Sequence, residues 1–257
     1  MNMKIVILAG GFGTRLSEFT DLIPKPMVEI GGKPILVHIM EHYMSYGFND
    51  FVIALGYKQD YVKTYFSNYR LYKNDFSIDF YTDTLSVINQ KNLDFKMTLV
   101  DTGLNTMTGG RLKRLSKILG DQTFMMTYGD GLCDVDISKL VDFHKNHKKM
   151  ITMTAVRPNA RFGEIKFEND IVSKFEEKPQ LHDGWINGGF FVINSSFLDF
   201  IVSDEIMLER EPLSTAASMK ELVAFRHEGF WQCMDSKKDY DYLQSLLKDG
   251  KAPWLKG

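Results

Sequence analysis

The feature that most constrains the fold lies near the start of the chain, where a short apolar run ends in a cluster of glycines. Residues 4–9 are mostly apolar, and Gly-Gly-Phe-Gly follows at positions 10–13. The run predicts a buried strand. The glycines predict a loop whose free backbone N–H groups and permissive dihedral angles admit a phosphate closely. We therefore expect a ligand site at the end of the first strand.

This loop differs from two familiar glycine motifs. The dinucleotide-binding pattern needs glycine or alanine at its last position, but the pattern that starts at Gly11 reaches Leu16 there. The P-loop is absent because the Gly-Lys pair at 32–33 is followed by Pro34 instead of serine or threonine. A nicotinamide-dependent dehydrogenase is accordingly disfavoured.

Strand-like and helical patterns alternate along the first half of the chain, which predicts an α/β fold with a mostly parallel main sheet. We expect strands at residues 4–9, 50–55, 123–128 and 150–156, and helices at 34–47, 59–68, 111–119 and 137–147. Residues 68–97 lose the helical period, and we expect them to leave the main sheet.

The second half changes to paired strands, which predicts a mixed sheet. We expect strands at 163–168, 171–176, 186–194 and 222–234, and a closing helix at 237–248. No internal repeat or polar linker interrupts the chain, so we expect one domain, 1–257, with two lobes of about 1–157 and about 158–257.

Charge and composition exclude several classes of function. The 31 Lys and Arg residues against 33 Asp and Glu give a net charge of −2, which argues against a broad nucleic-acid surface. The early apolar run is too short for a secretory signal or a membrane span, so we expect a cytoplasmic chain without a membrane partner. Cys133 and Cys233 form no CxxC pair, which disfavours a zinc knuckle, a redox dithiol and a disulfide.

Two cations lie close to the glycine loop in the sequence. Arg15 stands inside the loop, and the backbone of Lys25 is restrained by Pro24 and Pro26. A guanidinium that binds two oxygens at once, beside a compact ammonium, suits a polyphosphate. The alternative is a flexible loop with two solvated cations.

Two aspartates follow apolar runs and are candidate metal ligands. Asp130 lies between two glycines after the expected strand at 123–128, and Asp235 follows the strand-like residues 230–234. Ligands of open α/β sheets bind at the carboxyl ends of strands, and Mg²⁺ takes one or two carboxylates together with substrate phosphates. The alternative is a pair of ordinary turn aspartates.

Other residues carry weaker signals. Two glycines, Gly188 and Gly189, interrupt a good strand pattern, which indicates close approach of a ligand or backbone, or an ordinary bulge. His38 and His42 share one helix face but lack the glutamate of a zinc protease, so we expect them at a surface or interface, and His144 on a helix surface. No Ser-His-Asp or Cys-His arrangement is evident.

These motifs together resemble the sugar-1-phosphate nucleotidylyltransferases. The resemblance rests first on LAGGFGTRL and PKPM, and it extends from Met3 to about Trp254. The segments TMTGGRLKR and GFWQCMD are similar to the branch of the family that uses CTP. The family implies a Rossmann-like nucleotidyltransferase fold with a mixed, mostly parallel sheet, and a homo-oligomer, commonly a hexamer.

The resemblance also implies a role for each site residue. Backbone groups of Leu8, Ala9, Gly10, Gly11, Phe12, Gly13 and Thr14 would hold the nucleotide, Arg15 and Lys25 would grip the phosphates, and Thr106, Arg111 and Gly129 would contact the base and nucleotide. Glu177 and Lys178 would meet the sugar phosphate, Asn187 and Gly188 would line the sugar side, and Asp130 and Asp235 would bind Mg²⁺.

The implied reaction transfers the cytidylyl group of CTP to α-D-glucose 1-phosphate and releases diphosphate. CDP-glucose commonly feeds the deoxysugars of bacterial surface polysaccharide such as O-antigen. A phosphate monoester has a second pKa of about 6 and is largely a dianion at neutral pH, so it attacks without a general base. The alternatives are the same reaction with UTP or dTTP, and a non-catalytic sugar-nucleotide sensor.

Overall fold

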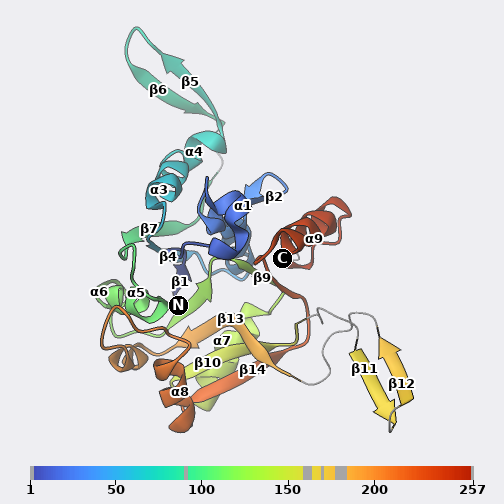
Figure 1. The fold of residues 1–257 in the computed structure, drawn as a ribbon. Helices are drawn as coiled ribbons and strands as arrows, with labels where there is room; N and C mark the ends of the chain where they lie inside the picture. Colours follow the sequence, from blue (N-terminus) through green and yellow to red (C-terminus); the bar gives the residue numbers. More distant parts are fainter. Residues whose placement is uncertain (1–2, 90–91, 159–163, 169–170, 177–183, 256–257) are drawn as a thin grey trace.

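A central sheet with helices on both faces forms the body of the protein in a computed structural model, which describes residues 3–89, 92–158, 164–168, 171–176 and 184–255 (Figure 1). The sheet has seven strands in the order β14-β10-β13-β8-β1-β4-β7. They are β1 Lys4–Leu8, β4 Asp50–Leu55, β7 Lys96–Asp101, β8 Phe124–Tyr128, β10 Ile151–Val156, β13 Ile186–Ile193 and β14 Leu222–His227.

The sheet is mixed and mostly parallel, as the sequence predicts. Strand β1 pairs in parallel with β4 and β8, β4 pairs in parallel with β7, and β10 pairs in parallel with β14. Only β13 of these strands runs against its neighbours, β8 and β10. Because β13 and β14 come from the second half of the chain, both halves contribute to one continuous sheet.

Alternate residues of the strands enter two apolar cores, one on each face of the sheet. In β1, Ile5 and Ile7 belong to one core, and Val6 and Leu8 belong to the other. Burying each such side chain stabilises the fold by about 1.5–3 kcal/mol. The first core takes residues of α2 Ile35–Ser45, α3 Gln59–Ser67, α7 Ile137–His147 and α9 Lys237–Lys248, and the second takes residues of α5 Thr108–Arg114, α6 Ser116–Leu119, η3 Ser195–Phe200 and α8 Glu211–Ser218.

Several predicted elements differ in detail from the structure. The helix expected at 111–119 begins earlier, at Thr108, and is divided at Leu115 into α5 and α6. The early start follows from a close contact, because the amide groups of Gly109 and Gly110 donate to the Ile206 carbonyl. The residues expected to be strand within 222–234 divide between β14 and β15 Trp231–Cys233, which pairs with β9 Gly131–Cys133 outside the main sheet.

The described residues between 68 and 95 lie outside the main sheet, as predicted, and include a hairpin that projects from the body (Figure 1). The prediction is wrong for residues 96 and 97, which begin the unpredicted edge strand β7 and pair with β4. Helix α4, Tyr69–Tyr72, leads into β5 Asp75–Asp79, which pairs with β6 Thr84–Ile88. Its exposed apolar side chains are Phe76, Ile78, Phe80, Tyr81, Leu85 and Ile88. An isolated two-stranded hairpin is marginally stable in water, so this surface is suited to contact with a partner.

The remaining elements are short. They are η1 Thr14–Leu16, α1 Ser17–Thr20, η2 Lys25–Met27, the pair β2 Glu29–Ile30 and β3 Lys33–Pro34, the hairpin β11 Glu164–Glu168 and β12 Ile171–Glu176, and η4 Pro253–Leu255. Among the described residues, none of the helices combines the length and the apolar character needed to cross a membrane.

The expectation for three histidines is wrong. His38, His42 and His144 are buried, with exposed fractions of 2%, 4% and 4%. The Nε2 atoms of His38 and His42 lie 2.9 Å from the carbonyl oxygens of Ile30 and Val135. His38 Nδ1 also accepts from Trp254 Nε1 at 3.3 Å, whereas His42 Nδ1 is buried without a hydrogen-bond partner among the described residues. Burial lowers the pKa of each of these histidines below its ordinary value.

Candidate active site

A pocket of about 780 Å³ opens at the carboxyl ends of β1 and β8. Open α/β sheets bind ligands at this edge. Sixteen of the residues singled out from the sequence line it: Leu8, Ala9, Gly10, Gly11, Phe12, Gly13, Thr14, Arg15, Lys25, Thr106, Arg111, Gly129, Asp130, Asn187, Gly188 and Asp235. Two more, Glu177 and Lys178, lie outside the described residues.

The glycine loop leaves β1 and turns sharply at Gly13. Gly13 has a φ of 66°, in the left-handed region that glycine adopts without strain, and its carbonyl accepts the amide of Leu16 at 2.9 Å. The Thr20 hydroxyl donates to the same carbonyl at 3.1 Å. Since Gly11 would meet nothing within 4 Å if it carried a Cβ, the loop presents open backbone to the pocket.

The Arg111 side chain supports the glycine loop through hydrogen bonds to backbone carbonyls. Its Nη2 donates to the Gly10 carbonyl at 2.9 Å, and its Nη1 donates to the carbonyls of Leu55 at 2.9 Å and Gly103 at 2.7 Å. A Cβ on Gly10 would lie 2.2 Å from Arg111 Nη1. The buried guanidinium faces backbone carbonyls in place of water, and this burial lowers the pKa of Arg111. In this structure Arg111 holds two walls of the pocket together.

A small two-stranded ribbon brings the two aspartates to one place. In the antiparallel pair of β9 and β15, Gly131 lies opposite Cys233. Asp130 directly precedes β9 and Asp235 follows β15 by two residues, and the Met234 amide donates to the Asp130 carbonyl at 2.9 Å. The ribbon explains how residues 105 positions apart in sequence reach one site.

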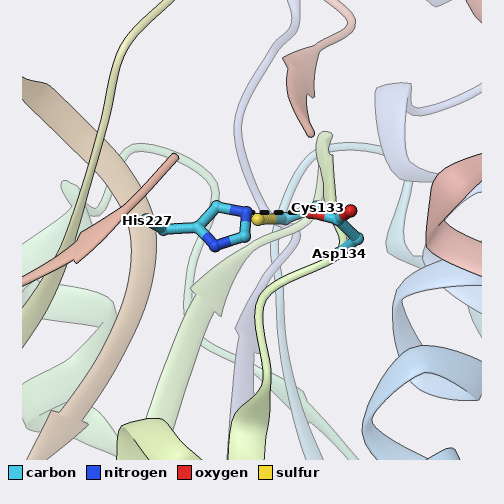
Figure 2. Close-up of side chains that lie close together, drawn as sticks. All are labelled: Cys133, Asp134 and His227. Atoms are coloured by element: carbon cyan, nitrogen blue, oxygen red, sulfur yellow. Dashed lines mark hydrogen bonds and ion pairs between the residues drawn. The ribbon is translucent and has the colours of Figure 1, made fainter. Parts of the chain in front are cut away.

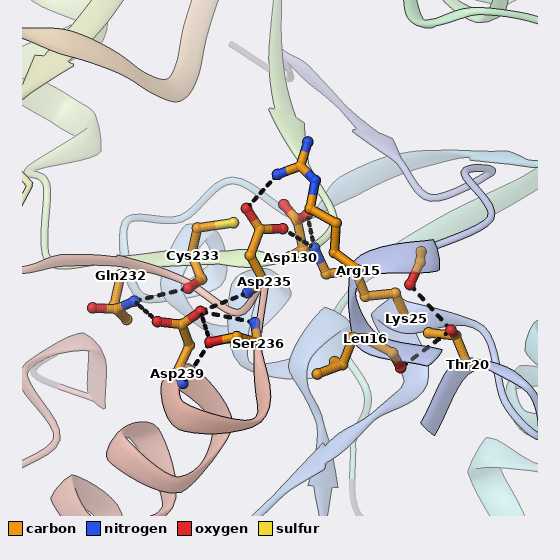
Figure 3. Close-up of polar contacts among 11 residues, drawn as sticks. Arg15, Leu16, Thr20, Lys25, Asp130, Gln232, Cys233, Asp235, Ser236 and Asp239 are labelled. Carbon is orange, nitrogen blue, oxygen red and sulfur yellow. Dashed lines mark hydrogen bonds and ion pairs between the residues drawn. The ribbon is translucent and has the colours of Figure 1, made fainter. Parts of the chain in front are cut away.

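The start of α9 fixes the backbone of Asp235. Ser236 is the N-cap, and the Asp239 carboxylate accepts the amides of Asp235 at 3.1 Å and Ser236 at 2.8 Å (Figure 3). This capping box satisfies amides that a helix start leaves unpaired. Asp235 therefore stands on a rigid turn.

Lys25 and Arg15 pair with these aspartates (Figure 3). Lys25 Nζ lies 2.6 Å from Asp130 Oδ2 and 2.6 Å from Asp235 Oδ1, and Arg15 Nη1 lies 2.7 Å from Asp235 Oδ2. Burial opposes the charge on Lys25, but the two carboxylates outweigh it and raise the pKa of Lys25 above its ordinary value. Burial likewise opposes the charge on Asp235, yet its bonds to Lys25 hold the pKa of Asp235 below the ordinary value. Both groups are charged at neutral pH.

Lys25 and Arg15 differ sharply in exposure. The side chain of Lys25 is 10% exposed and that of Arg15 is 77% exposed. An exposed ion pair contributes little because water screens it, so Arg15 is free to move toward a ligand.

The opposite wall of the pocket contains the predicted bulge. The register of β10 and β13 shifts between Met153 and Ala155, opposite the glycines of β13. A Cβ on Gly188 would lie 3.0 Å from the Thr154 carbonyl, and Trp231 Nε1 donates to the Gly188 carbonyl at 2.7 Å. The two glycines thus mark both a bulge and the close approach of another backbone, because the bulge brings that backbone near.

Three residues of this wall were not predicted as site residues. Tyr128 donates its hydroxyl to Glu209 Oε1 at 2.5 Å, and Thr108 donates to Glu209 Oε2 at 2.7 Å. All three line the pocket. Tyr128 ends a predicted strand next to Gly129, which is a usable signal, whereas Glu209 lies in an irregular segment without a recognisable motif.

The two cysteines have different surroundings. Both are free thiols, and Cys133 is 1% exposed whereas Cys233 lines the pocket. Burial and the nearby Asp130 raise the pKa of Cys233, so its thiol is protonated at neutral pH.

A second polar group on the ribbon is structural. Asp134 Oδ1 lies 2.9 Å from His227 Nε2 and accepts the Phe230 amide at 2.7 Å, with Cys133 beside them (Figure 2). These contacts tie the end of β9 to the turn before β15. They hold the ribbon that positions Asp130 and Asp235.

The donor set of Asp130 and Asp235 fits a divalent cation. Carboxylate oxygens of both residues lie within 4.8 Å of each other and of the Cys233 sulfur. Mg²⁺ prefers such hard oxygen ligands and completes its shell with water and phosphate oxygens. The buried ammonium of Lys25 between the two carboxylates marks this position as one that stabilises positive charge.

Comparisons with known proteins agree with this geometry. The family model described as nucleotidyl transferase matches residues 4–240. The chain is 50% identical over 253 residues to glucose-1-phosphate cytidylyltransferase of Salmonella typhi, and the match covers 98% of each chain. It is 40% identical to a probable glucose-1-phosphate cytidylyltransferase of Bacillus subtilis, over 98% of this chain and 99% of that one.

The fold is shared with solved structures of lower identity. A putative glucose-1-phosphate thymidylyltransferase from Bacillus anthracis, solved with sucrose, aligns with a TM-score of 0.69. It is 19% identical, and the match covers 96% of each chain. The architecture is therefore preserved where most residues differ.

Proposed function

This chain belongs to the nucleotidyl transferase family, and on that basis we propose that it transfers the cytidylyl group of CTP to α-D-glucose 1-phosphate, giving CDP-glucose and diphosphate. The observation that carries the choice of substrates is the 50% identity to a glucose-1-phosphate cytidylyltransferase across nearly the whole chain. The geometry agrees, since the pocket combines a glycine loop, two cations and two carboxylates.

The backbone of the glycine loop holds the triphosphate in this proposal. The open amides near Gly11 donate to phosphate oxygens, and Arg15 turns from Asp235 toward them. Thr106 lies on the same wall as Arg111 and contacts the nucleoside. These contacts hold the α-phosphorus in line with the attacking oxygen.

The sugar phosphate occupies the side of the pocket at Asn187 and Gly188, with Glu177 and Lys178 as further contacts. Its phosphate is a dianion near neutral pH and needs no general base. The residues have two tasks, which are to reduce the repulsion between two anions and to stabilise the departing diphosphate. Lys25 and Arg15 supply positive charge for both tasks.

Asp130 and Asp235 hold the Mg²⁺ in this proposal, as their oxygen donors and their spacing allow. When bound, Mg²⁺ neutralises phosphate charge and orients the leaving group. The rigid turn at Ser236 and the ribbon of β9 and β15 keep the two carboxylates together for it.

We further propose that the chain acts as a cytoplasmic homo-oligomer, a hexamer as the family resemblance suggests, whose product feeds surface-polysaccharide synthesis. The exposed apolar side chains of the hairpin β5–β6 support self-association. Light scattering on the purified protein measures the mass directly, and a monomer of 29.6 kDa would contradict the oligomer.

The function is tested by offering the protein glucose 1-phosphate and Mg²⁺ with CTP, UTP or dTTP in separate reactions. We expect CDP-glucose and one equivalent of diphosphate in the first. Comparable product from UTP would assign the chain to another base, and binding of sugar nucleotides without any product would indicate a sensor. Labelled CTP alone should leave no nucleotide on the protein, because the displacement is direct.

A further inference from the structure

The ammonium group of Lys25 occupies the space between the two candidate metal ligands. It lies 2.6 Å from Asp130 Oδ2 and 2.6 Å from Asp235 Oδ1, and its side chain is 10% exposed. The same carboxylates belong to the group whose ligand atoms all lie within 4.8 Å of one another. A lysine therefore stands where a cation that bridges both carboxylates would stand.

A divalent ion and the Lys25 ammonium are poorly compatible at this position. Each carboxylate has further lone pairs, but an ion that bridges Asp130 Oδ2 and Asp235 Oδ1, the oxygens that Lys25 contacts, would lie close to the ammonium and be repelled by it. Removing Lys25 without replacement is also unfavourable, because two close carboxylates repel each other. The two carboxylates are therefore more stable with a cation between them, either the ammonium or a metal ion.

The Lys25 side chain has another position available. Its backbone is fixed in η2 between Pro24 and Pro26, but four methylene groups separate that backbone from the ammonium. Lys25 and the glycine loop line one pocket, so a phosphate held at the loop is a second partner for the ammonium.

We infer that Lys25 and the divalent cation compete for Asp130 and Asp235, and that the phosphates of the nucleotide end the competition by binding the ammonium of Lys25. Metal and nucleotide then strengthen each other's binding, and thermodynamic linkage makes the effect reciprocal. The inference rests on the proposed function only in naming a nucleoside triphosphate, since the competition itself involves this chain's residues and the metal alone.

Arg15 provides the matched control. It contacts Asp235 through the other carboxylate oxygen, at 2.7 Å, so R15Q removes one positive charge from the same aspartate. Because Arg15 is 77% exposed and does not lie between the two aspartates, its removal does not clear the space for a metal. Competition predicts a strong effect of K25Q and a weak effect of R15Q. An equal gain in both variants would show that the charge near Asp235, and not the space between the two carboxylates, limits metal binding.

The experiment measures Mn²⁺ binding to the full chain by electron paramagnetic resonance, without nucleotide. We expect K25Q to bind Mn²⁺ about tenfold more tightly than the wild type or better, and R15Q less than about threefold. Adding D235N to K25Q should abolish the gain. Unchanged or weaker binding by K25Q, or an equal gain in R15Q, would overturn the inference.

A second measurement needs no variant. Crystals of the wild-type protein soaked in Mn²⁺ should show the ion by anomalous scattering at Asp130 and Asp235, with Lys25 Nζ withdrawn from both. An ion bound to both carboxylates while Lys25 remains bonded to them would contradict competition. If K25Q gains no Mn²⁺ affinity but the protein turns over CTP, only this inference fails. If K25Q gains affinity but the protein forms no product from CTP, only the proposed function fails.

Discussion

Arg111 Nη2 donates a hydrogen bond of 2.9 Å to the carbonyl oxygen of Gly10, which also accepts the Tyr57 amide at 3.1 Å. The guanidinium thus fixes the glycine loop to the end of β4 and to the segment at 103–104. We expect Arg111 to act on a bound nucleotide through the backbone that it orients.

Replacing Arg111 with Lys should weaken both the fold and nucleotide binding. Lysine keeps the charge but cannot reach all of the carbonyls at once. The carbonyls of Gly10 and Leu55 keep backbone amide partners, so the loss is that of hydrogen bonds from a charged donor, about 1.5–3 kcal/mol each. We expect the free energy of unfolding to fall by at least that amount and the Kd for CTP to rise about tenfold. Urea unfolding and calorimetry measure these quantities. Wild-type affinity in R111K would show that the loop is held by other contacts.

Substituting Asp130 or Asp235, the proposed metal ligands, should remove activity and leave the fold intact. We expect D130N and D235N each to lower kcat/KM by about 10²–10³-fold, because each loses a charged ligand at the site of phosphoryl transfer. The matched control is D142N, an aspartate on the exposed face of α7 that pairs with Lys145. Steady-state kinetics measure the loss of kcat/KM, and circular dichroism checks that each variant is folded. Full activity in either site variant would disprove the metal assignment.

The two thiols should respond differently to a bulky maleimide. We expect Cys233 to react and turnover to fall, with CTP slowing the reaction, because Cys233 lines the pocket. The reaction should accelerate as pH rises, since the pKa of Cys233 is raised and the thiolate is the nucleophile. Cys133, which is buried in the apolar core, should stay unmodified. Peptide mass spectrometry locates the label, and inhibition that persists in C233A would contradict the assignment.

The buried histidines should make the protein less stable in mild acid. Burial lowers the folded-state pKa values of His38, His42 and His144 below 6.5. The unfolded chain then binds more protons than the folded chain once the pH falls below 6.5, so the stability present above that pH is lost on acidification. We expect the free energy of unfolding to decrease between about pH 6.5 and 5 and the slope to be smaller in H42Q. A flat profile over that range would contradict buried neutral rings.

The elements that were predicted well are those with a local signal. The helix at Ile137–His147 starts at Asp136, whose side chain accepts the Lys139 amide, and the helix at Lys237–Lys248 starts with a capping box. The strand Asp50–Leu55 is a continuous buried run. The division of α5 from α6 and the separation of β14 from β15 depend on contacts with distant segments, which no local pattern contains.

The same limit applies to the site. Arg15, Lys25, Asp130 and Asp235 follow from motifs at the ends of strands, and the structure brings them into one pocket. The pairing of Lys25 with both aspartates needs the ribbon of β9 and β15, whose register spans about a hundred residues of sequence. The burial of the histidines likewise depends on tertiary packing, because the elements that pack against a helix determine which of its faces is exposed.

The proposed reaction is transfer of the cytidylyl group of CTP to glucose 1-phosphate in this pocket. It is tested by comparing kcat/KM for CTP with kcat/KM for UTP at saturating glucose 1-phosphate and Mg²⁺. The rate is measured as diphosphate release. We predict a preference for CTP of about a hundredfold or more, since cytosine and uracil have opposite donor and acceptor roles at the 4-substituent and at N3, which a specific site must satisfy. Equal values for CTP and UTP, or no diphosphate with either, would contradict the account.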